Sequence, residues 1–238
     1  MREMTIAVVQ MDTKLGEADA NLAKMSEFIR KICAQQKVDL ILFPELATTG
    51  SEAGAQITQL VQRVPGPSTN YMSQRASEMG LHIAFGLPTK ERVESILFNS
   101  AVLIGPEGDI LSHYRKVHLR GEEQMIYRPG FRLEPAETPV GTVGLQVGWD
   151  VLFPEGSRSL CLDGAEIILV SAAWDREHAA EWGLNPHKIG LVGFSAGGRL
   201  AATLLQAYDQ ASRPDFVGFI YGGLWEEFPA PADAPPLF

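Results

Sequence analysis

The sequence has 238 residues, of which 45% are hydrophobic and 21% charged, as is usual for a soluble globular protein of one large or two small domains. The formal net charge of −9 disfavours a nucleic-acid partner, because phosphate backbones attract basic surfaces. No run approaches the roughly 18 apolar residues that span a bilayer, and the N-terminus lacks a signal-peptide pattern. We therefore expect a cytoplasmic protein with no membrane partner.

Apolar runs and amphipathic stretches alternate along the first part of the chain. Strands are predicted over 5–11, 39–45, 82–88, 143–149 and 166–172, and helices over 21–36, 69–79 and 157–163. Residues 95–116 carry the clearest hairpin signal, since two β-rich runs flank the turn sequence Pro-Glu-Gly-Asp at 106–109. This alternation predicts an α/β fold whose strands are largely buried on both faces, including the first.

The pattern continues beyond residue 174. We predict helices over 176–183 and 197–210, and strands over 188–194 and 216–223. The two cysteines, Cys33 and Cys161, are far apart, have no metal-ligand spacing and argue against a disulfide scaffold. Both fall in predicted helices, where we interpret them as small buried apolar residues.

Three predicted strands in the first part end on polar or glycine residues. LILFPE ends on Glu45, SHYRKVHL carries Lys116, and LQVGWD carries Gly148 followed by Trp149 and Asp150. A fourth motif, E-x-x-x-Y-x-P-G, runs over 123–130, and WDVLFPE runs over 149–155. In this order the motifs resemble those of the carbon–nitrogen hydrolase (nitrilase) superfamily, and the resemblance covers about residues 4–174.

The resemblance implies an α-β-β-α nitrilase-like layered sandwich, C-terminally incomplete here, that hydrolyses a small amide or nitrile without a cofactor or metal. It implies Glu45 as general base, Lys116 as the group that stabilises the oxyanion, and Glu123 as a supporting second glutamate. It also points to Trp149 and Asp150 as substrate-binding residues. Members of the superfamily commonly dimerise, so a homodimer is expected. Taken singly, Glu45 and Lys116 have a second interpretation, as solvated surface charges.

The family's nucleophilic cysteine normally stands directly before the aromatic-Asp pair, and here that position is Gly148. Covalent acyl transfer needs a nucleophile within hydrogen-bond reach of its base, and glycine offers neither thiol nor hydroxyl. The remaining route is a water molecule activated by Glu45, for which we expect a large loss of rate. Whether this chain is an active enzyme is therefore an open question at the level of sequence.

A second motif, Gly-x-Ser-x-Gly, places Ser195 between a predicted strand and a predicted helix, the context of a nucleophile elbow. Residues 176–238 resemble esterases of the α/β-hydrolase superfamily, which implies Ser195 as an alternative nucleophile acting on an ester. In those esterases the acid and the histidine follow the serine, whereas all five histidines here precede it. An upstream histidine, His178 or His187, would have to complete the site in space. The alternative is an unactivated serine.

The two resemblances divide the chain into a nitrilase-like domain, 1–174, and an appended strand-helix-strand segment, 175–238. We expect the second part to dock on the first and cover strand edges that would otherwise be exposed. Three functions follow as hypotheses: a carbon–nitrogen hydrolase-like protein with doubtful activity, a serine esterase, and a non-catalytic chimeric or truncated relic.

Overall fold

The computed structural model describes residues 4–51, 53–91, 96–173, 190–194 and 216–220. The chain divides into two compact units, Met1–Ala173 and Trp174–Phe238, and each is described by itself. In the second unit, β9 (Gly190–Phe194) and β10 (Phe216–Ile220) pair in parallel, with Phe216 opposite Gly190. These two strands confirm the predictions over 188–194 and 216–223. Ser195 and the helices predicted over 176–183 and 197–210 lie outside the described residues.

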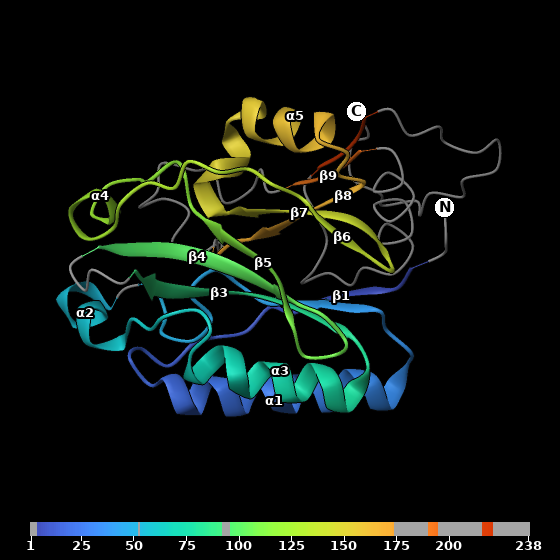
Figure 1. Cartoon of the computed structure of the whole chain (residues 1–238), viewed down its shortest axis with the longest axis horizontal. Helices are drawn as coiled ribbons and strands as arrows, with labels where there is room; N and C mark the ends of the chain where they lie inside the picture. Colours follow the sequence, from blue (N-terminus) through green and yellow to red (C-terminus); the bar gives the residue numbers. More distant parts are fainter. Residues whose placement is uncertain (1–3, 52, 92–95, 174–189, 195–215, 221–238) are drawn as a thin grey trace. The chain divides into compact units, whose positions relative to one another are not determined.

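The first unit contains two sheets that face each other (Figure 1). One sheet has the order β1 (Ile6–Val8), β2 (Leu40–Leu42), β3 (His82–Lys90), β4 (Leu97–Ile104) and β5 (Ile110–Arg115). Its first three strands are parallel, and β3, β4 and β5 are antiparallel. The other sheet has the order β6 (Ala136–Thr138), β7 (Gly141–Val147) and β8 (Ile167–Ser171). The predicted hairpin is confirmed, since β4 and β5 pair around the turn at 106–109.

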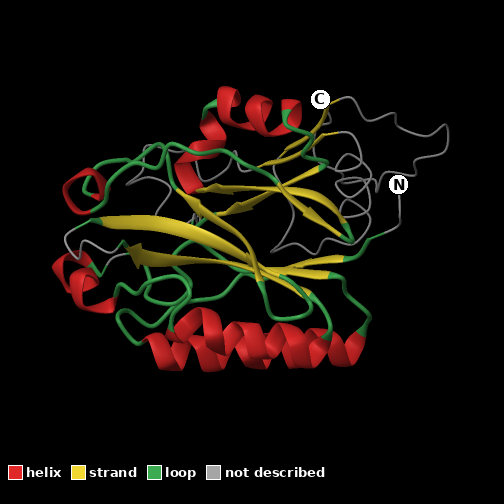
Figure 2. Cartoon of the chain, viewed as in Figure 1, coloured by secondary structure: helices red, strands yellow, loops and turns green. Residues whose placement is uncertain are grey.

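Helices α1 (Ala18–Gln35) and α3 (Pro67–Met79) lie on the outer face of the larger sheet, and α5 (Pro154–Leu162) lies on that of the smaller one (Figure 2). The short helices α2 (Ile57–Leu60) and α4 (Glu123–Ile126) lie at one end of the sheets, and the 3₁₀ turns are η1 (Gly54–Gln56) and η2 (Gly148–Leu152). The predicted apolar face of α1 is confirmed, because Leu22, Met25 and Ile29 are buried and Ile32 packs against them. On the opposite side, the buried Leu160 of α5 lies against Gly144 of β7.

Two apolar layers hold these elements together. The first contains Met25 and Ile29 of α1, Met72 of α3 and the facing side chains of the larger sheet, such as Ile83. The second lies between the sheets and joins residues such as Leu103 to those of β7 and β8. Helix, sheet, sheet and helix thus follow one another, which confirms the predicted α-β-β-α layering.

Two expectations on burial are wrong. Val8 is 71% exposed, because β1 is an edge strand and only β2 pairs with it among the described strands. Cys161 is exposed on α5, since the helix turns Leu160 and not its neighbour toward the sheet. Cys33 is partly buried and packs against the α1 core, closer to what the sequence predicted. The short strand β6 was not predicted, because three residues carry too little periodicity.

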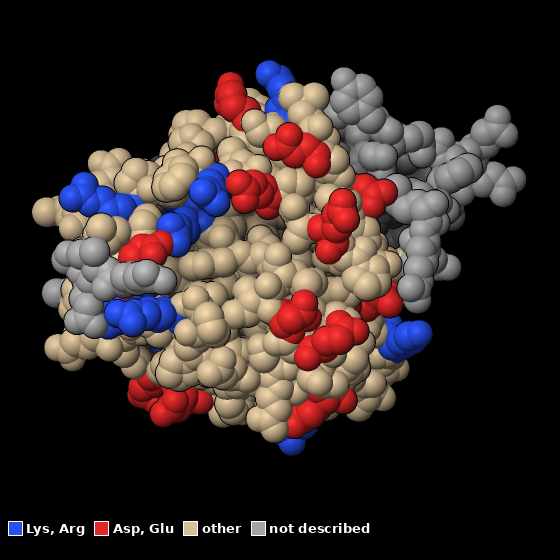
Figure 3. Space-filling model, in the orientation of Figure 1, with Lys and Arg blue, Asp and Glu red and all other residues tan. Residues whose placement is uncertain are grey.

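The described surface mixes both signs of charge. On the face shown in Figure 3, basic side chains lie mostly toward the side that carries α2 and α4, and acidic ones are spread over the rest, with neutral areas between. Among the described residues, no helix has the length and apolar character needed to cross a bilayer.

Candidate active site

Glu45 lies in a turn just after β2, and its backbone is held tightly by β3. The amide of Gly86 donates to the carbonyl of Pro44 at 3.0 Å, and a β-carbon on Gly86 would lie 2.6 Å from Cα of Glu45. Only glycine fits such an approach without displacing the turn. The next residue, Leu46, has a φ of 48°, a left-handed conformation that costs free energy in a leucine. Glu45, directly before this strained residue, is 7% exposed.

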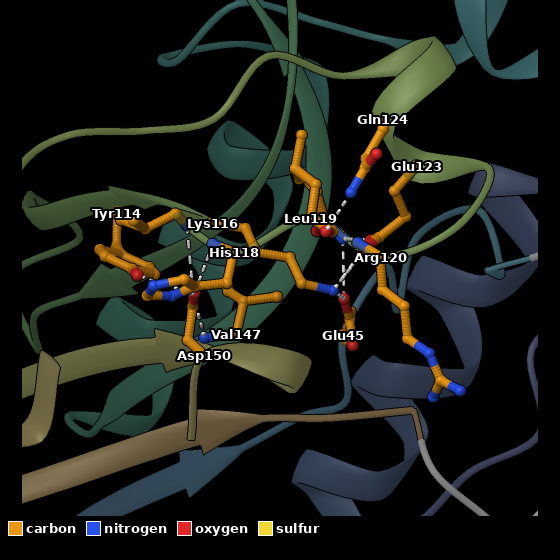
Figure 4. A network of polar contacts seen from close by, with 12 residues as sticks. Glu45, Tyr114, Lys116, His118, Leu119, Arg120, Glu123, Gln124, Val147 and Asp150 are labelled. Carbon is orange, nitrogen blue, oxygen red and sulfur yellow. Dashed lines mark hydrogen bonds and ion pairs between the residues drawn. The ribbon is translucent and has the colours of Figure 1, made fainter. Parts of the chain in front are cut away.

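Lys116 follows β5 directly and meets both predicted glutamates. Its Nζ lies 2.7 Å from Oε1 of Glu45 and 2.9 Å from each carboxylate oxygen of Glu123 (Figure 4). Its amide donates to the carbonyl of Asn99, and its carbonyl accepts from Gly130, both at 2.8 Å. The lysine is 4% exposed. The structure thus brings together three of the predicted residues from separate segments as an ion-paired group, in which Glu45 and Lys116 are buried and Glu123 is partly exposed.

Asn99, in the middle of β4, belongs to the same group and was missed by the sequence analysis. Its Nδ2 donates to Oε1 of Glu45 at 2.7 Å and to Oε1 of Glu123 at 2.8 Å. The available signal was a polar residue inside the apolar run LFNSAVLI, at a position that turns out to be fully buried. Buried amides require partners, so such a residue indicates a polar neighbour from elsewhere in the chain.

The electrostatics of the group favour a charged lysine beside a carboxylate with increased proton affinity. Burial raises the pKa of Glu45, and the nearby Glu123 raises it further, which outweighs the opposite effects of Lys116 and Asn99. Burial alone would lower the pKa of Lys116, but the two carboxylates outweigh it and the net shift is upward. A carboxyl group with a raised pKa suits proton transfer near neutral pH, and a permanent cation suits a developing oxyanion.

Gly148 starts η2 at the end of β7, with a φ of 45°. A β-carbon built there would lie 3.0 Å from the carboxyl carbon of Glu45 and 3.1 Å from its Oε1, with Oε2 closer still. The carboxylate of Glu45 therefore reaches the backbone of Gly148. The position that the family resemblance assigns to the nucleophile thus lies beside the predicted base.

Asp150 and Trp149 follow in the same turn. Asp150 is 2% exposed, and its oxygens accept hydrogen bonds from Tyr114 Oη at 2.7 Å and from the amide of His118 at 2.7 Å. Its Oδ1 also lies 2.9 Å from Nδ1 of His118, whose ring stacks on Phe153. The guanidinium of Arg120 lies 4.4 Å from the centre of the Trp149 ring. Asp150 thus ties the turn that carries Gly148 to the segment that follows Lys116.

Burial and the charge of Asp150 raise the pKa of Tyr114, so the phenol stays a hydrogen-bond donor. The predicted substrate-binding roles of Trp149 and Asp150 stay predictions. Within the described ranges, no group of three or more His, Cys, Asp or Glu side chains is arranged to hold a metal ion.

The sequence model of the carbon–nitrogen hydrolase family matches residues 5–185. This chain belongs to the carbon–nitrogen hydrolase family. It is 36% identical over 182 residues to a probable nitrilase of Schizosaccharomyces pombe, covering 75% of this chain and 67% of that protein. It is 34% identical over 169 residues to a nitrilase of Pyrococcus abyssi, covering 68% and 62%. The chain thus spans somewhat less than two thirds of the length of the second relative.

Solved structures of the nitrilase superfamily share the fold. An amidase from Nesterenkonia sp. AN1, in a cysteine-to-alanine mutant solved in complex with butyramide, is 26% identical with a TM-score of 0.66, covering 77% of this chain and 70% of that one. The superfamily member Nit3 of Saccharomyces cerevisiae is 21% identical with a TM-score of 0.69, covering 84% and 71%. The family match extends past 174 into the segment that the sequence pattern assigns to an esterase-like part. That second likeness stays a prediction.

Proposed function

We propose that this carbon–nitrogen hydrolase family member takes a small amide or nitrile at the group formed by Glu45, Lys116 and Glu123, and that its covalent route is disabled at Gly148. The observation that carries the proposal is the position of the Glu45 carboxylate, whose Oε1 lies 2.7 Å from Nζ of Lys116 and which occupies the space that a side chain at Gly148 would take. In this proposal Glu45 is the base, Lys116 stabilises the oxyanion, Glu123 supports the lysine, and Trp149 and Asp150 contribute to substrate binding.

The names of the relatives support this substrate class. An (R)-stereoselective amidase from Pseudomonas is 32% identical over 168 residues, and a 2-oxoglutaramate amidase from Bacillus subtilis is 28% identical over 185 residues. The Nesterenkonia mutant that lacks a cysteine was solved with butyramide bound. That complex supports the idea that a site of this kind holds an amide without its thiol.

The residues that remain allow one hydrolytic route. Glu45 takes a proton from a water molecule while the water oxygen attacks the amide carbon, and Lys116 stabilises the negative charge on the former carbonyl oxygen. The proton then passes from Glu45 to the nitrogen, the C–N bond breaks, and the products are a carboxylic acid and ammonia. Without the covalent intermediate, we expect turnover far below that of a thiol enzyme.

Two measurements test the proposal. Calorimetry with butyramide should show binding, and a sensitive ammonia assay at high protein concentration should show slow release that Glu45→Gln abolishes. Glu137→Gln, at an exposed position on β6, is the matched control and should leave both unchanged. A folded protein that neither binds butyramide nor releases ammonia would overturn the proposal, whereas binding without release would favour the non-catalytic alternative.

The second candidate is a serine esterase that uses Ser195, and the observation that favours it is the Gly-x-Ser-x-Gly motif after β9. A fluorophosphonate probe that labels the wild type but not Ser195→Ala, together with turnover of a p-nitrophenyl ester, would establish this activity. Absence of labelling would rule out the serine esterase.

A cytoplasmic location and a homodimer also remain predictions. Light scattering during size-exclusion chromatography tests whether the protein is a dimer.

A further inference from the structure

Two donors and two carboxylates form a closed ring of hydrogen bonds around Glu45. Nδ2 of Asn99 donates to Oε1 of Glu45 at 2.7 Å and to Oε1 of Glu123 at 2.8 Å. Nζ of Lys116 donates to the same two oxygens, at 2.7 and 2.9 Å. Each donor thus bridges both carboxylates, and each of those two oxygens accepts from both donors.

This ring of hydrogen bonds leaves one oxygen of the Glu45 carboxylate to face Gly148. Both hydrogen bonds described for this carboxylate go to Oε1, and Oε2 is the atom that a β-carbon on Gly148 would meet first. The last torsion of a glutamate side chain is broad, so a single donor leaves the carboxylate free to rotate. A second donor on the same oxygen, fixed on the rigid strand β4, restricts that rotation and keeps Oε2 directed at Gly148.

The orientation of the Asn99 amide follows from its neighbours. Turning the amide over would set its oxygen against two carboxylate oxygens, which have no proton to donate when ionised. In the orientation present, Oδ1 is buried and has no partner among the described residues, which costs free energy. The two hydrogen bonds from Nδ2 to charged groups offset that cost, since such bonds are stronger than those between neutral groups.

Asn99 also contacts the lysine through its backbone. Its carbonyl accepts from the amide of Lys116 at 2.8 Å, as part of the pairing between β4 and the end of β5. Asn99 therefore contacts the lysine backbone and both carboxylates.

We propose that Asn99 is a positioning residue that holds Oε2 of Glu45 toward Gly148, where a nucleophile would have to be deprotonated. A role of Asn99 in catalysis rests on the proposed function, whereas the effect of Asn99 on the Glu45 carboxylate does not. Because the hydrogen bond from Asn99 favours the ionised form, it lowers the pKa of Glu45 against the effect of burial. Removing the amide should therefore raise that pKa further.

The test is a titration of Glu45 followed by carbon NMR on protein with ¹³C-labelled glutamate, with the signal assigned by its loss in Glu45→Gln. Asn99→Leu keeps a similar side-chain volume and removes the donor, so the carboxyl signal of Glu45 should titrate at higher pH than in the wild type. Ser100→Ala, next on the same strand and hydrogen-bonded to Thr89 at 2.7 Å, is the control and should leave the titration unchanged.

An unchanged Glu45 titration in folded Asn99→Leu would overturn the inference. If that variant does not fold, Asn99→Ala is measured in the same way and judged by the same two outcomes. The titration needs no turnover, so it is independent of the ammonia assay. A raised pKa with unchanged ammonia release would keep Asn99 as the positioning residue and remove Glu45 from the proposed catalytic route.

Discussion

A β-carbon on Gly148 would lie 3.0 Å from the carboxyl carbon of Glu45, and all three of its nearest atoms would belong to that carboxylate. The two residues are far apart in sequence, and β2 and β7 belong to different sheets. The absence of a side chain at position 148 is thus what allows the carboxylate to take its present position. A thiol there would require Glu45 to rotate away from the backbone.

Gly148→Ala should destabilise the protein more than an alanine at a comparable open glycine. Gly54 has a similar φ of 51°, and a β-carbon there meets nothing within 4 Å. Both changes cost about 1 kcal/mol or more for the left-handed backbone, but only the first also crowds Glu45, at about 1 to 3 kcal/mol. Urea unfolding measures the difference. Equal losses in the two variants would mean that the carboxylate moves aside freely.

Gly148→Cys should create amidase activity, with the Glu45 carboxylate rotating to make room for the thiol while it keeps its bond to Lys116. We expect ammonia release from butyramide to rise at least about tenfold over the wild type, because covalent catalysis becomes available. Adding Glu45→Gln should abolish the gain. The two free cysteines are replaced in all variants, the partly buried Cys33 by alanine and the exposed Cys161 by serine, so that thiol labelling reports position 148 alone. A folded Gly148→Cys protein without any gain would count against a nitrilase-type pocket.

Gly86→Ala, on β3, should displace the backbone of the turn that carries Glu45. Its β-carbon would lie 2.6 Å from Cα of Glu45, a backbone atom that cannot turn aside, so the whole turn must shift. We expect a loss of roughly 1 to 3 kcal/mol in unfolding free energy, together with a changed NMR signal of the Glu45 carboxyl group. A stable variant with an unchanged signal would show that β3 does not determine the position of this turn.

Asp150→Asn should weaken the link between the turn at Gly148 and the segment after Lys116. An amide in place of the carboxylate sets a donor against Tyr114 Oη, the His118 amide or the His118 ring, at least one of which loses its partner. We expect a loss of about 1 to 3 kcal/mol, measured by chemical unfolding. Asp163→Asn, at an exposed position after α5, should cost far less.

The stability should fall on acidification partly because of His113. Burial, with a smaller effect of Arg115, lowers the pKa of His113 to about 4 in the folded protein, from an ordinary value of 6.5. Between these two pH values the unfolded chain binds more protons than the folded chain, so stability is lost as the pH falls from 6.5 toward 4. The contribution to the slope is at most about 1.4 kcal/mol per pH unit.

This contribution is isolated by comparing the unfolding of the wild type and of His113→Leu at several pH values. The contributions of all other titratable groups to the pH dependence cancel in the difference between the two proteins. The variant should lose less stability on acidification over this range, and Ser112→Ala should behave like the wild type. Parallel pH profiles for wild type and His113→Leu would contradict the assignment.

Much of the fold was predictable because its signals are local. The apolar face of α1, the turn between β4 and β5, and the strands that precede Glu45 and Gly148 each arise from periodicity and turn residues within one short segment. The ordered motifs also pointed to Glu45, Lys116 and Glu123, which the structure brings into contact. Edge and centre positions in a sheet cannot be told apart in this way, and for that reason the exposure of Val8 was missed.

The sequence by itself determined the residue types: a carboxylate after β2, a lysine after β5 and a glycine at the position that the family resemblance assigns to the nucleophile. Only the tertiary structure decided how they meet. Asn99 bridges Glu45 and Glu123 because β4 runs beside the ends of β3 and β5, and Glu45 covers Gly148 because the two sheets pack face to face. These are contacts between distant segments, and no local pattern encodes them. The sequence shows that position 148 has no side chain, and the packing of the two sheets places the Glu45 carboxylate in the space that a side chain there would take.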